Sequence, residues 1–191
     1  MELQVHNLCK SYGGETVLRD VSFTASPGVT CLMAPSGAGK TTLLRILLGL
    51  ETADSGTMRI PADCRWAAVF QEDRLLERLD AMGNLRFVLG KGFREAAAAA
   101  LLAELGLGDV GGKPVRDFSG GMKRRLAVAR ALLAPSDILV LDEPFTGLDM
   151  DSRRRCVEAI RARTAGKTVL LVTHDESDGG AFAARTVRLK K

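Results

Sequence analysis

The sequence of 191 residues has no long apolar run and no N-terminal pattern of a secretory signal. Its longest unbroken apolar stretches, such as residues 96–103, fall far short of the roughly 20 residues that a membrane-spanning helix needs. Any role at a membrane is therefore expected to be indirect. Residues 1–5 lack a positively charged start followed by an apolar run, so we expect a protein that is made and kept in the cytosol.

Paired cysteines and a strong excess of one charge are also missing. The four cysteines lie far apart with no Cys-x-x-Cys pair, which argues against a zinc knuckle or a disulfide framework. We interpret Cys9, Cys31, Cys64 and Cys156 as reduced packing residues. The 27 Lys and Arg against 23 Asp and Glu give a formal net charge of +4, which is compatible with phosphate ligands, an acidic partner or neither.

What the sequence does contain is an ordinary globular composition, with 46% hydrophobic and 26% charged residues. This excludes disordered, collagen-like and coiled-coil chains. The length fits one domain spanning residues 1–191, with room for a small inserted subdomain but not for two enzyme domains.

Short apolar runs alternate with segments of helical periodicity along the chain. Several runs are continuously apolar, as in strands that are buried on both faces. The alternation predicts an α/β fold with a mostly parallel sheet covered on both sides. The predicted strands cover residues 3–8, 17–23, 29–33, 56–60, 66–70, 138–141 and 168–172, and the predicted helices cover residues 40–48, 84–89, 93–105, 119–133 and 151–163.

A glycine-rich segment, residues 34–42, follows one of these strands and opens a helix, which is the context that a phosphate-binding P-loop requires. Its glycines let backbone N–H groups turn toward phosphate oxygens, and the helix N-terminus adds positive partial charge. We expect Lys40 to bridge the β- and γ-phosphates of a nucleotide and the Thr41 hydroxyl to bind Mg²⁺. Alone, the segment is also compatible with a turn that binds nothing. The other candidate nucleotide-binding residues here are Ser36, Gly37, Ala38, Gly39 and Thr42.

One residue of this segment departs from the motif Gly-x4-Gly-Lys-Ser/Thr, because Ala34 stands where the first glycine belongs. If that position needs a positive φ, alanine costs on the order of 1 kcal/mol of strain. Restoring glycine would then leave the ATP affinity unchanged or improve it.

Two adjacent carboxylates, Asp142 and Glu143, end the predicted buried strand 138–141. In open α/β sheets, ligands bind at the carboxyl ends of the strands. We expect Asp142 to hold Mg²⁺ on a nucleotide and Glu143 to orient or deprotonate the attacking water. An exposed turn with two solvated acids is the alternative, and the upstream P-loop argues against it.

Three further residues lie next to predicted strands of the same sheet. Gln71 and His174 each follow a strand, and Tyr12 lies in a glycine-rich turn after the first strand. Taken singly, these would be a surface glutamine, a satisfied histidine and a packing tyrosine. Together with the motifs above, Gln71 and His174 become candidate sensors of the γ-phosphate, Gln71 also a candidate Mg²⁺ ligand, and Tyr12 a candidate for stacking on adenine.

The most specific motif is Phe-Ser-Gly-Gly-Met at residues 118–122. It is similar to the signature Leu-Ser-Gly-Gly-Gln of ABC transporters, and the chain resembles the nucleotide-binding subunit of that family over nearly its whole length. A serine and two glycines at a helix N-terminus make chemical sense as an anion site. Without the other motifs, the same residues would be an ordinary helix cap.

The resemblance assigns a role to each motif in order along the chain. It makes Glu143 the catalytic glutamate and His174 the switch histidine, with Gln71 and Lys40 completing the catalytic set. It adds Ser119, Gly120, Gly121 and Asp149 to the nucleotide-binding residues. The matching segments are Tyr12 as the A-loop, 34–41 as Walker A, Gln71 as the Q-loop, 138–142 as Walker B and 147–149 as the D-loop.

The resemblance also implies an architecture and partners. It implies a P-loop NTPase core with a small antiparallel β subdomain, here trimmed, and an inserted helical subdomain at about residues 72–118. It implies a head-to-tail dimer with a second copy or a related ATPase subunit, in which two ATP molecules are sandwiched. It further implies a separate transmembrane permease that contacts residues 71–119, a location on the cytoplasmic face of the membrane, and no direct nucleic-acid partner. We expect no regulatory domain after this chain.

Other functions stay open at this stage. The chain could be a soluble ABC ATPase acting on nucleic acid or ribosomes, although such members typically carry two such domains or long insertions. It could also be a degenerate module that closes on ATP without turnover, because Ala34, Phe118 and Met122 replace consensus residues. Since the catalytic residues are present, we expect hydrolysis. Residues 70–76 look like the corresponding stretch in importers of nitrate, taurine and sulfonates.

Overall fold

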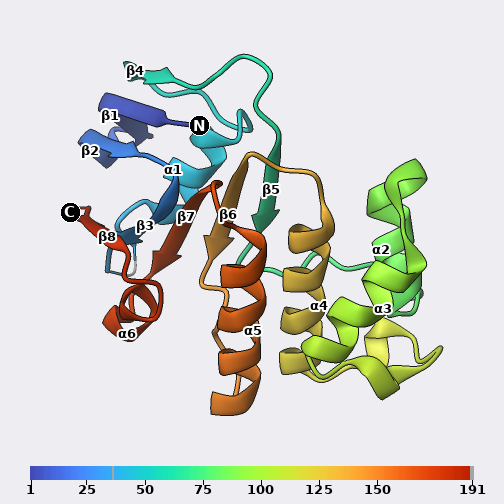
Figure 1. Ribbon diagram of the computed structural model, residues 1–191. Helices are drawn as coiled ribbons and strands as arrows, with labels where there is room; N and C mark the ends of the chain where they lie inside the picture. Colours follow the sequence, from blue (N-terminus) through green and yellow to red (C-terminus); the bar gives the residue numbers. More distant parts are fainter. Residues whose placement is uncertain (36, 190–191) are drawn as a thin grey trace.

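The computed structural model describes residues 1–35 and 37–189, which fold around two β-sheets (Figure 1). The larger sheet has five strands in the order β5-β6-β7-β3-β8. Every neighbouring pair in it is parallel, which confirms the predicted parallel sheet. The strands are β3 (Gly28–Met33), β5 (Trp66–Val69), β6 (Ile138–Asp142), β7 (Thr168–Thr173) and β8 (Arg185–Arg188).

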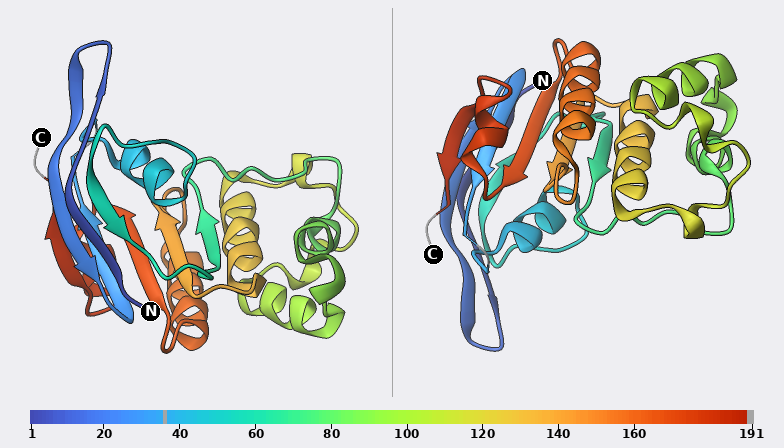
Figure 2. Two further views of the ribbon diagram at one scale, coloured as in Figure 1. Left: turned by 90° about the horizontal axis from the view of Figure 1, so that it is seen from above. Right: turned by 90° about the horizontal axis from the view of Figure 1, so that it is seen from below.

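The smaller sheet is antiparallel and has the strand order β2-β1-β4. It consists of β1 (Leu3–Tyr12), β2 (Glu15–Ala25) and β4 (Ser55–Arg59), and it confirms the predicted antiparallel part of the fold. The hairpin of β1 and β2 extends well beyond the rest of the molecule (Figure 2). Tyr12 is the last residue of β1, paired with Glu15, and does not lie in the turn as the sequence suggested.

The parallel sheet separates two hydrophobic cores, which explains its continuously apolar strands. Successive residues of a strand point to opposite faces, so that Leu170 packs with α1 and the small sheet while Leu171 packs with α4 and α5. Figure 2 shows α1 on one face of the sheet and α5 on the other. These helices are α1 (Lys40–Leu47), α4 (Gly120–Leu133) and α5 (Met150–Arg163).

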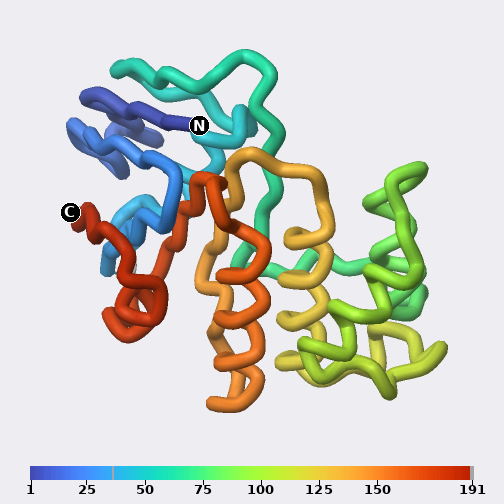
Figure 3. The backbone as a smooth tube through the Cα atoms, in the orientation of Figure 1, coloured from blue at the N-terminus to red at the C-terminus, as the bar shows by residue number. Residues whose placement is uncertain are grey.

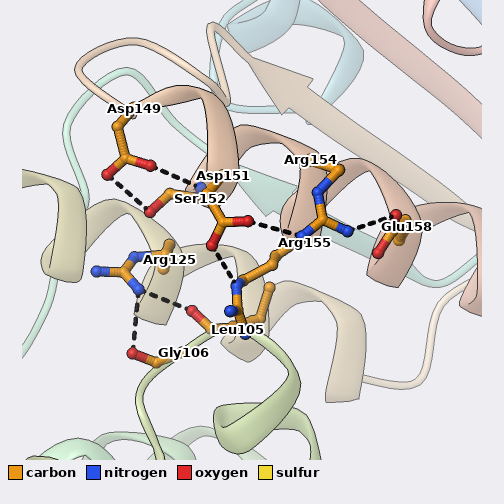
Figure 4. Close-up of polar contacts among 9 residues, drawn as sticks. All are labelled: Leu105, Gly106, Arg125, Asp149, Asp151, Ser152, Arg154, Arg155 and Glu158. Atoms are coloured by element: carbon orange, nitrogen blue, oxygen red, sulfur yellow. Dashed lines mark hydrogen bonds and ion pairs between the residues drawn. The ribbon is translucent and has the colours of Figure 1, made fainter.

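Two helices lie between β5 and α4 in the chain, within the segment predicted as an insertion. They are α2 (Ala81–Leu89) and α3 (Glu95–Glu104), and α4 separates them from the parallel sheet (Figures 1 and 3). Arg125 on α4 attaches the C-terminal end of α3, because its Nη1 donates to the carbonyls of Leu105 at 2.9 Å and Gly106 at 3.1 Å (Figure 4). No helix within residues 1–35 and 37–189 is long and apolar enough to cross a membrane.

Some elements differ from the sequence-based prediction. Helix α2 begins at Ala81 rather than at residue 84, because Asp80 caps it by accepting a 2.6 Å hydrogen bond from the Gly83 N–H. The prediction missed α6 (Glu176–Gly180) and β8. Both are short and rich in polar residues, so neither shows an apolar period that distinguishes it from a loop.

All four cysteines are free thiols. Cys31 and Cys156 are fully buried, and burial raises the pKa of the Cys31 thiol to about 11 and that of Cys156 to about 12. These two are packing residues, as predicted. Cys9 and Cys64 are only half-buried.

Candidate nucleotide-binding site

A cavity of about 490 Å³ opens at the carboxyl ends of the parallel strands. This is the edge at which α/β sheets bind ligands. Nine of the residues predicted from the sequence line it together, from the P-loop, the ends of β6 and β7, and the segment after β5. The lining residues are Val17, Gly37, Gly39, Lys40, Thr41, Thr42, Gln71, Asp142, Glu143, Thr146 and His174; sequence reasoning missed Val17 and Thr146.

Glycine is required at the start of α1 by close packing against β2. Gly39 caps the helix with a φ of 78°, in the left-handed region that favours glycine. A Cβ added there would lie 2.6 Å from Leu18 Cδ2 and 2.7 Å from the Val17 carbonyl oxygen. The absence of a side chain at Gly39 therefore lets the start of α1 lie against β2 at the edge of the cavity. Ser36, also predicted as a phosphate ligand, lies outside the described residues.

The expected strain at Ala34 is not present. Positive φ values occur at five non-glycine residues of the described chain, and Ala34 is not one of them. Its side chain is 5% exposed and belongs to the core beside α1. Its carbonyl accepts a 3.0 Å hydrogen bond from Lys40 Nζ, which places the ammonium over the loop. Alanine therefore fits this position without a backbone penalty.

Glu143 brings the P-loop and the end of β7 together. Its Oε1 lies 3.2 Å from Lys40 Nζ and 2.9 Å from His174 Nδ1. Glu143 is 8% exposed and has a φ of 48°, a conformation that costs about 1 to 3 kcal/mol for a non-glycine residue and occurs often at functional sites. Its N–H donates to the Val172 carbonyl at 2.8 Å, and this bond helps to hold the strained turn in place.

Behind Glu143 lies a polar network that the sequence did not predict. Thr173 Oγ1 donates to Asp178 Oδ2 at 2.7 Å, and Asp178 Oδ1 accepts from Arg153 Nη2 at 2.8 Å. Asp178 is 5% exposed. No spacing in the sequence marks these three residues as neighbours, since they come from β7, α6 and α5.

Asp142 is the second buried carboxylate of the cavity, at 4% exposure. Burial raises its pKa, and the neighbouring carboxylate of Glu143 raises it further, while Lys40 and Arg124 act in the opposite direction. Burial disfavours the charged form of such an acid, and a nearby cation stabilises that form. The same cavity is lined by Thr41, which has a hydroxyl group, and by Gln71, which has an amide group.

This donor set fits Mg²⁺. Hydroxyl, amide and carboxylate oxygens are its preferred protein ligands, and Mg²⁺ usually binds to one or two carboxylates together with substrate phosphates. Among residues 1–35 and 37–189, no group of three or more His, Cys, Asp or Glu side chains is arranged to hold a metal by itself. A donor set with one carboxylate fits a metal that is held jointly with a nucleotide.

The other predicted nucleotide ligands do not line this cavity. Tyr12 is 45% exposed on the hairpin, with Lys10 Nζ 5.2 Å from its ring centroid. Ser119 caps α4 by accepting from the Met122 N–H at 3.3 Å, and Gly120 and Gly121 follow it in the first turn. Asp149 caps α5 by accepting from the Ser152 N–H at 2.8 Å (Figure 4). Within the described residues, six predicted ligands thus do not line the cavity of their own chain: the buried Ala38, the exposed Tyr12, and Ser119, Gly120, Gly121 and Asp149 at the starts of α4 and α5.

Comparisons with known proteins identify the family of this chain. The sequence profile of the ABC transporter family matches residues 18–146. The aliphatic sulfonates import ATP-binding protein SsuB 2 of Burkholderia lata is 40% identical over 193 residues, which cover 94% of this chain and 70% of that protein. The Nod factor export ATP-binding protein I of Cupriavidus metallidurans is 41% identical over 190 residues, which cover 90% of this chain and only 62% of that protein.

A solved structure shows the same fold. The structure described as the ATP binding subunit of an ABC transporter superposes with a TM-score of 0.87 at 27% identity, covering 99% of this chain and 86% of the other. The family match includes the P-loop, the paired carboxylates and the turn that contains Thr146. The chain therefore belongs to the ABC transporter family, as an ATP-binding domain with ATPase activity.

Proposed function

We propose that this domain hydrolyses Mg²⁺-bound ATP in the cavity at the end of the parallel sheet and thereby drives a separate membrane-spanning subunit. The observation that carries the proposal is the convergence on Glu143 Oε1 of Lys40 Nζ at 3.2 Å and His174 Nδ1 at 2.9 Å. These groups come from the start of α1 and from the residues that directly follow β6 and β7, so three separate elements converge on one cavity.

Each side chain has a distinct task in this proposal. Lys40 and the N–H groups of residues 39–42 bind the phosphates, as expected for a helix N-terminus. Glu143 accepts the proton of the attacking water, and His174 orients the carboxylate of Glu143 through their hydrogen bond. The low exposure of Glu143 keeps bulk water from competing for that carboxylate.

Thr41, Gln71 and Asp142 are the residues that would hold Mg²⁺. When bound, the metal supplies positive charge that offsets the negative charge of the phosphate oxygens. Asp142 contributes the only carboxylate of the three. Its charged form, disfavoured by burial, is stabilised by a cation at this position.

The active unit in this proposal is a head-to-tail dimer with a second copy or a related ATPase subunit. The support is the position of Ser119, Gly120, Gly121 and Asp149 outside the cavity of their own chain. Ser119 and Gly120 are exposed at the start of α4, and the N–H groups of Gly120 and Gly121, which the Ser119 cap does not use, can meet a nucleotide held by the other copy. The exposed aromatic ring of Tyr12 is the candidate for adenine stacking.

A membrane-spanning permease is the partner through which hydrolysis does mechanical work. The support is the family membership together with relatives named as ATP-binding proteins of importers and of an exporter. In this proposal the domain acts at the cytoplasmic face of the membrane, where ATP is available. The segment between Gln71 and Ser119 contacts the permease, and its α2 exposes Phe87 at 70% and Val88 at 48%.

Replacement of the proposed general base tests the function. Glu143→Gln keeps the shape of the side chain and removes its basicity, so we expect the steady-state ATPase rate to fall at least about 100-fold. The affinity for ATP should stay unchanged. Glu104→Gln is the matched control, because Glu104 forms a surface ion pair with Arg163, and its rate should equal that of the unaltered protein. Equal rates for Glu143→Gln and the unaltered protein would overturn the assignment, and the absence of turnover in both would indicate a module that only binds ATP.

A further inference from the structure

Arg124 is a buried cation that the proposed reaction does not use. It lies on α4, five residues after Ser119, and is only 6% exposed. Arginine is rarely buried to this extent unless its charge is paired, because desolvation of the guanidinium is costly. Arg124 does not line the nucleotide cavity. The role of Arg124 is therefore inferred from its hydrogen-bond partners.

Those partners all belong to the segment that follows β5. Nη1 donates to the Phe70 carbonyl at 2.6 Å, and Nη2 donates to the Gln71 carbonyl at 2.7 Å. Nη1 also lies 3.1 Å from Asp73 Oδ1. Within the described chain this oxygen has no hydrogen-bond partner, so the contact with Asp73 is an ion pair without hydrogen-bond geometry.

This arrangement fixes the backbone at Gln71. The two arms of a planar guanidinium hold two consecutive carbonyl groups, and such a fork has little freedom to rotate. The carbonyls on both sides of the Gln71 N–Cα bond are therefore held in one orientation, which sets the direction in which the Gln71 side chain leaves the backbone. Gln71 lines the cavity together with Asp142 and Thr41.

The same helix holds the rest of the segment. Arg130, further along α4, donates to the carbonyls of Asp73 at 2.8 Å and Arg74 at 2.6 Å. Residues 70–74 are thus bound to α4 by four backbone carbonyls. Arg125, next to Arg124, bonds instead to Leu105 and Gly106 (Figure 4), which lie on the inserted helical segment and away from the cavity lining.

We propose that Arg124 is a positioning residue that holds Gln71 at the metal-binding edge of the cavity. The inference rests on the proposed function in one respect, namely that Mg²⁺ is the group that Gln71 meets there. Because α4 begins with the residues that would face the nucleotide of the other copy, a shift of this helix would carry Gln71 with it.

Two variants of Arg124 and one control test the proposal in the full chain. Arg124→Gln removes the charge and the fork, whereas Arg124→Lys keeps the charge but lacks the planar fork that aligns with two consecutive carbonyls. Arg125→Gln is the control, because it makes the same change at the neighbouring position. Amide hydrogen exchange is measured on peptides covering residues 69–75 and 104–107. ATP binding is titrated with Mg²⁺ and, separately, measured in EDTA.

For Arg124→Gln we expect about tenfold faster exchange in residues 69–75, as expected for the loss of charged hydrogen bonds. The Mg²⁺ concentration that half-saturates ATP binding should rise about tenfold, which is the usual effect of removing a group that orients a metal ligand. ATP affinity in EDTA should stay unchanged. For Arg124→Lys, both the exchange rate in residues 69–75 and the half-saturating Mg²⁺ concentration should lie between those of the unaltered protein and of Arg124→Gln. Arg125→Gln should change the exchange rate only in residues 104–107.

Two results would overturn the proposal. Unchanged exchange in residues 69–75 of Arg124→Gln would show that the guanidinium does not hold the segment. An equal change in Mg²⁺ dependence for Arg124→Gln and Arg125→Gln would show a general structural effect of α4. The exchange measurement needs no turnover, so it decides the role of Arg124 even if the unaltered chain fails to hydrolyse ATP.

Discussion

Thr173 Oγ1 donates a hydrogen bond of 2.7 Å to Asp178 Oδ2, and the same hydroxyl lies 3.5 Å from Glu143 Oε2. A hydroxyl has one proton, so the shorter contact takes it. Thr173 Oγ1 also accepts from the Asp175 N–H at 3.0 Å, which shapes the turn that carries His174. Through Thr173, Asp178 thus acts on Glu143 and on the turn that carries His174, without a hydrogen bond to either residue.

The first prediction concerns this buried acid. Asp178→Asn removes the negative charge that faces Arg153, and we expect the free energy of unfolding to fall by about 1 to 3 kcal/mol. Because the turn that carries His174 loosens, kcat should fall while the ATP affinity stays unchanged. Glu176→Gln is the control on the same helix, since its pair with Arg188 is exposed and should contribute less than about 1 kcal/mol. Equal effects of the two variants on kcat and on chemical denaturation would contradict the prediction.

The second prediction separates backbone strain from steric clash at the two ends of α1. Gly39 and Gly49 both have positive φ, at 78° and 69°, but only Gly39 lies against β2. Gly49→Ala should lower the free energy of unfolding by about 1 kcal/mol, from strain alone. Gly39→Ala should lower it by about 3 kcal/mol or more, because the Val17 carbonyl belongs to the backbone of β2 and cannot move without distorting that strand. Chemical denaturation measures both, and similar losses would contradict the packing argument.

The third prediction concerns Ala34, where glycine stands in the P-loop motif. The structure shows no strain to relieve there, so Ala34→Gly should not improve ATP binding. It removes a buried methyl group and increases the freedom of the unfolded chain, which should lower the free energy of unfolding by about 1 to 2 kcal/mol. The ATP affinity should stay within about twofold, since the Ala34 carbonyl still accepts from Lys40. A gain in stability or a clear gain in affinity would show that alanine strains the loop.

Much of the cavity was predictable from the sequence because of one property of parallel sheets. The carboxyl ends of all the strands meet at one edge, so residues that follow separate strands, such as Gln71, Glu143 and His174, had to lie close together. The cores were predictable for a related reason. Strands buried on both faces are apolar throughout, and helices buried on one face show a period of 3.6 residues.

The polar supports of the cavity were not predictable in this way. Arg124 contacts residues more than 50 positions earlier in the chain, and Arg153 contacts Asp178, 25 positions later. As charged residues on helices, they look in the sequence like solvent-facing groups. Only tertiary packing decides that a particular guanidinium is buried. The φ of Ala34 was left open by the sequence for a similar reason, because a motif specifies a residue type and not the torsion angle that it adopts.

The last prediction concerns the head-to-tail dimer. Gly120 is exposed in the first turn of α4, its φ is not positive, and an added Cβ meets no described atom within 4 Å. An arginine at this position is therefore compatible with the fold of the single chain. In the dimer it would occupy the place at which α4 meets the nucleotide of the other copy. Gly112→Arg is the matched control, because Gly112 is equally exposed and unobstructed but lies in the inserted segment.

Both substitutions are introduced into the Glu143→Gln protein, which should bind ATP without consuming it. Light scattering with Mg²⁺ and ATP should give the mass of two chains for Glu143→Gln alone and for the variant with Gly112→Arg, and the mass of one chain for the variant with Gly120→Arg. ATP should still bind to that single chain, because the first turn of α4 does not line its own cavity. Dimers of the Gly120→Arg variant would place the first turn of α4 outside the contact between copies. Loss of ATP binding in the monomer would instead assign Gly120 to the nucleotide site of its own chain.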